Sequence, residues 1–340
     1  MNCRDFGISV GTMSTGVRNL ITDVAGIRVG HCTLETDECK TGVTVVLPCD
    51  GNVFRDKLVA ASFVLNGFGK TLGLVQIDEL GTLETPIALT NTLNVGLLHD
   101  ALVEYMLSQC EKDGIRLTSV NPVVCECNDA SLNNIALRAV KKEHVFRAIE
   151  SADADFALGD VGCGKGTTCH GLKGGVGSSS RIFELDGKTY TIGALVQTNH
   201  GRLADLRIDG KPVGREINET LNDSKPDKGS CIVIMATDLP VSSRQLRRII
   251  KRASIGLIRN GSYLGHGSGD VFVGFTTANR LYATEESVRS VELLNENKID
   301  IAFRACGECV EEAVLSSMLN AHTVKGYGGN VRLSLSDFIG

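Results

Sequence analysis

The chain has 340 residues, and 42% of them are hydrophobic, so it can bury a sizeable core as one large domain or two ordinary ones. The net charge of −5 and the pI near 5.9 argue against a protein that binds the phosphate backbone of nucleic acids. Residues 1–10 contain no stretch that resembles a signal peptide, and no run approaches the roughly 18 apolar residues of a membrane span. We therefore expect a cytoplasmic protein.

Short apolar runs predict strands that are buried on both faces, and patterns with a period near 3.6 predict helices. The predicted strands are residues 43–47, 191–197, 231–236 and 271–277. The predicted helices are residues 93–110, a segment from Ser242 to the Asn260-Gly261 stop signal, and residues 309–321. Ser242 followed by Gln245 forms a capping box. Mixed strands and helices indicate an α/β or α+β class.

A glycine-rich stretch, residues 159–180, invites a nucleotide-binding interpretation. However, Lys165 is followed by Gly166, where a phosphate loop needs Ser or Thr to reach magnesium. The spacing also misses the dinucleotide fingerprint. We expect instead that this stretch is the wall of a pocket, because glycines let main-chain N–H groups approach a ligand closely.

The second irregular stretch, residues 215–228, is charged and predicts an exposed loop. It changes abruptly at Gly229-Ser230 into an apolar strand. A serine hydroxyl beside a strained peptide bond can attack the preceding carbonyl, and water can then hydrolyse the ester. The product carries an N-terminal serine whose α-amine, with a pKa of about 7.7–8, can act as the base for its own hydroxyl.

The twelve cysteines are interpreted as reduced thiols of a cytoplasmic protein. Three groupings could suggest a metal: Cys306-x-x-Cys309, Cys125-x-Cys127 and Cys169-His170. None has the paired spacing of a structural zinc site. The sequence therefore favours buried or incidental thiols, and we predict neither a metal nor an organic cofactor.

Several longer motifs make the chain resemble the L-aminopeptidase/D-Ala-esterase/amidase family, whose relatives include β-peptidyl aminopeptidases and nylon-oligomer hydrolases. The most specific are Gly-Ser-Cys-Ile-Val-Ile-Met-Ala-Thr-Asp at 229–238, His-Gly-Ser-Gly-Asp at 266–270, Gln-Thr-Asn-His-Gly at 197–201 and Leu-Lys-Gly-Gly-Val-Gly at 172–177. Shorter similar segments lie at 26–31, 66–67, 84–87, 89–92, 122–124 and 252–253. The resemblance covers nearly the whole chain in the expected order.

The resemblance implies a four-layer αββα sandwich of the self-processing N-terminal-nucleophile type. Residues 1–340 would form a single catalytic domain, cleaved between Gly229 and Ser230 into fragments 1–229 and 230–340. The expected activity is release of N-terminal amino acids from small peptides, amides or esters through an acyl-enzyme. Family members form homo-oligomers, so we expect the same of this chain.

The family's site residues carry over position by position. Ser230 matches the nucleophile, Ser268 matches a serine that passes protons to or from it, and Asn199 matches an amide that holds the oxyanion. Asp270 stands where family members often have a glutamate that orients this serine.

One departure concerns the tyrosine that the family commonly supplies to the oxyanion region after Pro-Val-Val. The segment 125–131 has no aromatic residue, so Asn128 or another donor would substitute, or the substrate range would differ. Glu126 is predicted to pair with the amino group of the substrate.

Three other functions are alternatives to this one. A conventional Ser-His-Asp hydrolase would use one of several histidines, but no Gly-x-Ser-x-Gly elbow accompanies them. An acyltransferase of the ornithine acetyltransferase type also cleaves itself within a related fold, although it prefers a threonine nucleophile. The third alternative is an uncleaved small-molecule binding protein.

Overall fold

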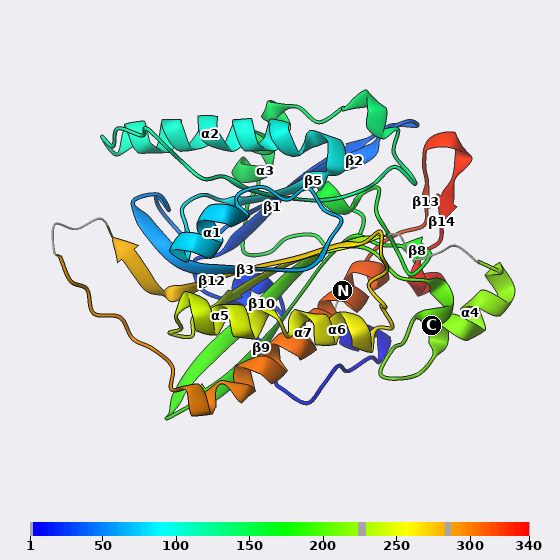
Figure 1. Ribbon diagram of the computed structural model, residues 1–340. Helices are drawn as coiled ribbons and strands as arrows, with labels where there is room; N and C mark the ends of the chain where they lie inside the picture. Colours follow the sequence, from blue (N-terminus) through cyan, green and yellow to red (C-terminus); the bar gives the residue numbers. More distant parts are fainter. Residues whose placement is uncertain (1–2, 224–228, 283–286, 340) are drawn as a thin grey trace.

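The computed structural model describes residues 3–223, 229–282 and 287–339, and its central feature is a six-stranded sheet (Figure 1). In spatial order its strands are β4 (Thr82–Leu83), β3 (Asp56–Gly67), β12 (Gly269–Tyr282), β11 (Ser230–Thr237), β10 (Lys188–Asn199) and β9 (Val176–Leu185). β11 and β12 pair in parallel, and the other neighbours pair antiparallel. Every residue of β11 is buried, which explains the uninterrupted apolar run in the sequence.

A second, four-stranded sheet faces the first. It consists of β1 (Arg28–Glu35), β2 (Lys40–Leu47), β5 (Ile87–Asn91) and β6 (Val123–Cys127) in that order. Apolar side chains from both sheets fill the space between them, including Ile232 and Ile234 of β11 and Cys125 of β6. The four predicted strands are confirmed and belong to β2, β10, β11 and β12.

Helices cover the outer face of each sheet. α2 (Val95–Lys112) and α3 (Lys142–Glu150) lie on the four-stranded sheet, and α5 (Ser243–Ile250), α6 (Ala253–Arg259) and α7 (Asp300–Leu319) lie on the six-stranded sheet (Figure 1). The predicted αββα sandwich is therefore confirmed. Smaller elements are α1 (Leu74–Leu80), α4 (Val213–Leu221), the hairpin of β7 (Thr168–Cys169) and β8 (Leu172–Lys173), and the hairpin of β13 (Val324–Lys325) and β14 (Val331–Arg332).

The helix predicted from Ser242 begins as expected but is broken. Ser242 Oγ accepts a hydrogen bond from Gln245 N, and Gln245 Oε1 accepts one from Ser242 N, so the capping box is confirmed. The break between α5 and α6 falls at Arg252. Its guanidinium lies 3.8 Å from the ring centroid of Phe303, and its Nη1 donates to Arg248 O.

Two other predictions were wrong in their limits. The last helix begins at Asp300 instead of residue 309, because Ala302, Ala305 and Cys306 already face the core. The predicted loop 215–228 is helical up to Leu221, since α4 buries Gly214 and Ile217 on one face. Residues 224–228 of that loop lie outside the described part of the chain. No helix among the described residues is long and apolar enough to cross a membrane.

The six-stranded sheet contains strands that precede the Gly229-Ser230 junction in the sequence and strands that follow it. β11 and β12 follow the junction, yet they are enclosed by β3 and β10, which precede it. Residues 230–340 therefore contribute the middle of this sheet. The single catalytic domain with an internal cleavage stays a prediction.

Candidate active site

Three neighbouring strands bring the predicted site residues to one end of the six-stranded sheet. Ser230 is the first residue of β11, and its register partners are Asn199, the last residue of β10, and Gly269, the first residue of β12. Ser230 is buried, with 7% of its surface exposed. The strand fixes the hydroxyl at a rigid position, as the abrupt change from loop to apolar run predicts.

A single backbone N–H contacts both groups of the Gly229-Ser230 junction. Gly269 N lies 3.4 Å from Ser230 Oγ and 3.3 Å from Gly229 O, and it donates to both. Gly229 has no room for a side chain, because a Cβ there would lie 1.8 Å from Asn199 O. A donor at the Gly229 carbonyl polarises it toward attack, and the serine hydroxyl is held beside the same donor.

Ser268 and Asp270 flank this donor and form a buried pair. Ser268 Oγ donates to Asp270 Oδ1 over 2.9 Å, and both side chains are fully buried. Aspartate, although shorter than the glutamate of the family pattern, therefore reaches the serine. The pair orients the Ser268 hydroxyl on the residue next to the backbone donor of Gly269.

Asn199 is held by its amide oxygen. Oδ1 accepts a hydrogen bond from Thr168 N over 3.0 Å, so the amide presents its Nδ2 hydrogens as donors. Thr168 belongs to the glycine-rich stretch, which packs its main chain against β10: a Cβ on Gly174 would lie 2.9 Å from Thr198 O. The glycines therefore permit the close approach that positions Asn199.

Glu126 lies near the junction, whereas Asn128 does not join it. Glu126 Oε1 accepts from Lys70 N over 3.0 Å, and Oε2 accepts from Thr92 Oγ1. The Cβ position of Gly69 is within 4 Å of both Glu126 Oε1 and Gly269 Cα. Asn128 is exposed, and its Oδ1 accepts from Ala130 N within a turn. Among the described residues, no hydrogen bond links Asn128 to Ser230 or Asn199.

Sequence reasoning missed the groups that hold the site residues in place. The Gly269 and Thr168 donors are backbone N–H groups, and Thr92 is a side chain that contacts Glu126. Of these three groups, only Thr92 could have been found from the sequence, because it is the last residue of the family-like segment 89–92.

The thiols close to the junction are poor alternative nucleophiles. Burial, together with the nearby Asp270 and Cys169, raises the pKa of the Cys231 thiol well above its usual range. The Cys127 thiol donates to Ser230 O and to Gln197 O, and burial raises its pKa as well. All twelve cysteines are free and eleven are buried, as the interpretation of reduced, buried thiols predicts.

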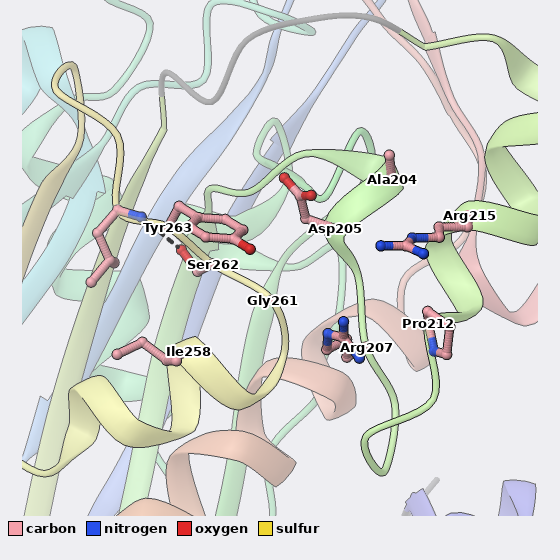
Figure 2. A pocket seen from close by; sticks show the side chains of 10 residues that line it. Ala204, Asp205, Arg207, Pro212, Arg215, Ile258, Gly261, Ser262 and Tyr263 are labelled. Carbon is pink, nitrogen blue, oxygen red and sulfur yellow. Dashed lines mark hydrogen bonds between the residues drawn. The ribbon is translucent and has the colours of Figure 1, made fainter.

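A cavity of about 440 Å³ lies between residues 204–215 and the segment 258–264, which leads from α6 toward Ser268 (Figure 2). Arg207 and Arg215 extend into it from one side, and Tyr263 lies across from them. The described residues that line this cavity include neither Ser230 nor Asn199. Asn66 Nδ2 donates to Leu264 O and Gly265 O and so anchors the loop between the cavity and Ser268.

Comparisons with known proteins agree over nearly the whole chain. The model of Peptidase family S58 matches residues 19–332. The β-peptidyl aminopeptidase BapA of Sphingosinicella microcystinivorans is 39% identical, covering 96% of this chain and 87% of that protein. The PH0078 protein from Pyrococcus horikoshii OT3 superposes with a TM-score of 0.93 at 46% identity, covering 98% of this chain and 96% of that one.

A second solved structure is the L-aminopeptidase D-Ala-esterase/amidase of Ochrobactrum anthropi. It superposes with a TM-score of 0.91 at 33% identity, covering 98% of this chain and 95% of that one. It is described as a prototype for the serine aminopeptidases and as a new variant among the Ntn hydrolase fold.

Proposed function

Because this chain belongs to peptidase family S58 and is a serine-type aminopeptidase, we propose that it cleaves itself between Gly229 and Ser230 and then uses Ser230 as an N-terminal nucleophile. The observation that carries the proposal is the single Gly269 N–H, which contacts both Gly229 O and Ser230 Oγ. These are the two oxygens that change during self-cleavage.

In the first reaction, Ser230 Oγ attacks the Gly229 carbonyl carbon and the peptide C–N bond breaks. The proton of the hydroxyl passes to the departing nitrogen, which becomes the α-amine of Ser230. Gly269 N–H stabilises the negative charge on Gly229 O. Water then hydrolyses the ester and releases the carboxylate of Gly229, leaving a free hydroxyl on Ser230.

In the second reaction, the new α-amine takes the proton of Ser230 Oγ, directly or through Ser268. The hydroxyl attacks the carbonyl of an N-terminal aminoacyl amide or ester, and the acyl-enzyme is hydrolysed. Asp270 keeps Ser268 oriented, and Asn199 Nδ2 donates to the oxyanion. The free-amine pKa of about 7.7–8 suits this role at neutral pH.

The proposed substrates are small peptides, amides or esters with a free amino terminus. Since β-peptidyl aminopeptidases are among the relatives, β-amino acid residues belong to the substrate range to be tested. Glu126 would receive the substrate ammonium, because its carboxylate lies near Gly269 while it remains buried.

Intact-mass analysis of the purified protein after incubation tests self-cleavage directly. We expect two fragments divided between Gly229 and Ser230 in place of one 36.3 kDa chain. An intact chain would favour the alternative of an uncleaved small-molecule binding protein. Partition of the acyl-enzyme between water and an amine acceptor separates a hydrolase from an acyltransferase of the ornithine acetyltransferase type, because only the acyltransferase would strongly prefer the amine.

The predicted homo-oligomer and the cytoplasmic location remain part of the proposal. Light scattering of the cleaved protein would measure the number of chains in the assembly.

Replacement of Asn199 should lower kcat by about 10²–10³ with little change in KM, because an oxyanion donor acts mainly in the transition state. Asn199→Asp is the informative variant. It keeps an acceptor for Thr168 N–H but removes both amide hydrogens, so it should lose as much activity as Asn199→Ala. Steady-state kinetics on fully cleaved protein measures this, and an active Asn199→Asp enzyme would refute the donor role.

Glu126→Gln should raise KM by roughly 10–100-fold for substrates with a free amine, because the variant loses a buried charge partner. Initial rates with an aminoacyl anilide measure the effect. An acyl anilide without the amine serves as the control substrate and should bind the variant and the wild type alike. Glu38→Gln, an exposed position, should leave both substrates unaffected. An unchanged KM for the amine substrate would count against the assignment.

A further inference from the structure

The sequence offers Cys169-His170 as one possible pair of metal ligands. In the structure His200 lies beside this pair and supplies a third possible ligand. The ligand atoms of the three side chains all lie within 4.8 Å of one another, and all three residues are buried. We propose that Cys169, His170 and His200 bind a zinc-class divalent ion. This proposal departs from the sequence prediction of no metal.

The backbone holds two of the ligands together. Cys169 is the last residue of β7, and His200 directly follows β10. His170 N donates to His200 O over 2.7 Å, so the two chain segments are already paired beside the side chains. A Cβ on Gly201 would lie 2.4 Å from His170 Nδ1, so only glycine leaves room for this imidazole. The cluster is therefore built by two segments that lie about thirty residues apart in the chain.

His170 has the tautomer that a metal ligand requires. Its Nδ1 lies 3.1 Å from Arg202 O. Because a carbonyl only accepts hydrogen bonds, Nδ1 must carry the proton, and the lone pair resides on Nε2. A histidine that donates its other ring N–H to a backbone carbonyl is the usual arrangement around protein-bound metals, since it fixes the ring orientation and the tautomer.

His200 supplies independent support. In the described part of the chain, neither of its ring nitrogens has a hydrogen-bond partner, although the residue is only 3% exposed. Leaving such a buried polar group without a partner is unfavourable. In a neutral imidazole one of the two ring nitrogens carries a lone pair. Coordination of an ion would satisfy that lone pair.

The ligand chemistry selects the ion. One thiolate and two imidazoles suit zinc and similar borderline-soft ions, whereas magnesium and calcium prefer oxygen ligands. Zinc bonds of about 2.0–2.3 Å hold tetrahedral ligand atoms closer to one another than the 4.8 Å found here. The three side chains would therefore move slightly toward one another when the ion binds. Three protein ligands leave a fourth position for water or another group.

The position of the site indicates a structural ion. Cys169 packs in the cluster between the six-stranded sheet and its helices, together with Cys231. Because side chains alternate along a strand, Ser230 projects to the other face of β11. A Cβ on Gly229 would lie 2.4 Å from His200 Cα. The ion would thus hold the chain segment that adjoins both Asn199 and Gly229, without touching the reacting atoms.

Cobalt titration tests this proposal independently of peptidase activity. The full-length protein is stripped with a chelator under reducing conditions and titrated with Co²⁺. We expect one ion per chain, a thiolate-to-cobalt charge-transfer band and the visible bands of tetrahedral Co²⁺, all reversed by Zn²⁺. Cys169→Ser should lose the charge-transfer band, and His200→Gln should weaken binding by at least about 100-fold.

Cys32→Ser is the matched control, because Cys32 is the partly exposed thiol most open to adventitious metal. Its spectrum should equal that of the wild type. X-ray absorption of the zinc-loaded wild type needs no variant and should show one sulfur at about 2.3 Å with nitrogen ligands at about 2.0–2.1 Å. A zinc shell without sulfur, no stoichiometric binding, or binding unaffected by both ligand variants in folded protein would overturn the proposal.

Discussion

Ser230→Ala is expected to remain one chain of 36.3 kDa and to lose aminopeptidase activity by a factor of roughly 10⁴–10⁶. The variant removes the atom that attacks the Gly229 carbonyl, so no new amino terminus forms. It also removes the nucleophile of the second reaction. One substitution therefore eliminates both the maturation and the turnover. Intact mass spectrometry and an aminoacyl anilide assay on the same preparation measure the two losses together.

Cys231→Ala is the matched control for this experiment. It removes the adjacent thiol on the opposite face of β11 and leaves the Ser230 hydroxyl with its Gly269 contact. The control should cleave and should retain activity. If Ser230→Ala still divides at the same bond, or if it remains fully active while Cys231→Ala does not, the nucleophile is wrongly assigned.

The central strands of the fold could be predicted because burial on both faces leaves a direct mark on the sequence. β11 reads as an unbroken apolar run for this reason. α4 could not be predicted in the same way. It buries only Gly214 and Ile217, so charged residues dominate its sequence and it resembles a loop. A helix that packs through one narrow face gives a weak periodic signal.

The site could be predicted only in part. The sequence specifies which side chain stands at each position, but it does not show which backbone N–H groups point into the site. Family motifs pointed to Ser230, Ser268, Asp270 and Asn199. The Gly269 and Thr168 N–H donors could not be found from spacing, since every residue except proline carries such a group and only the register selects one. Asn128 is one candidate to replace the family tyrosine, because it lies in the segment after Pro-Val-Val; its exposed side chain accepts a hydrogen bond from Ala130 N, and its role stays a prediction.

The buried ion cluster around Arg181 was also invisible in the sequence, because arginine and glutamate are usually exposed. Arg181 is fully buried in β9, and its guanidinium lies 2.7 Å from Glu312 and 3.2 Å from Glu308, both in α7. It also donates to Val10 O. The two glutamates extend the network to the amino-terminal segment, since Thr12 N donates to Glu308 and Arg4 to Glu312.

Arg181→Met is therefore expected to lower the free energy of unfolding by about 3–5 kcal/mol, the usual cost of leaving buried charges without their partner. Methionine fills part of the volume, but two carboxylates stay buried beside it. Thermal and denaturant unfolding of cleaved protein measure the loss. Arg18→Met is the matched control: its ion pair with Asp155 is exposed, so the cost should stay below about 1 kcal/mol.

A triple variant separates the charge effect from packing. Adding Glu308→Gln and Glu312→Gln to Arg181→Met removes the two negative charges that Arg181 contacted and should recover part of the lost stability, because neutral amides cost less to bury than carboxylates. If Arg181→Met were as stable as Arg18→Met, the cluster would contribute no more than a surface ion pair.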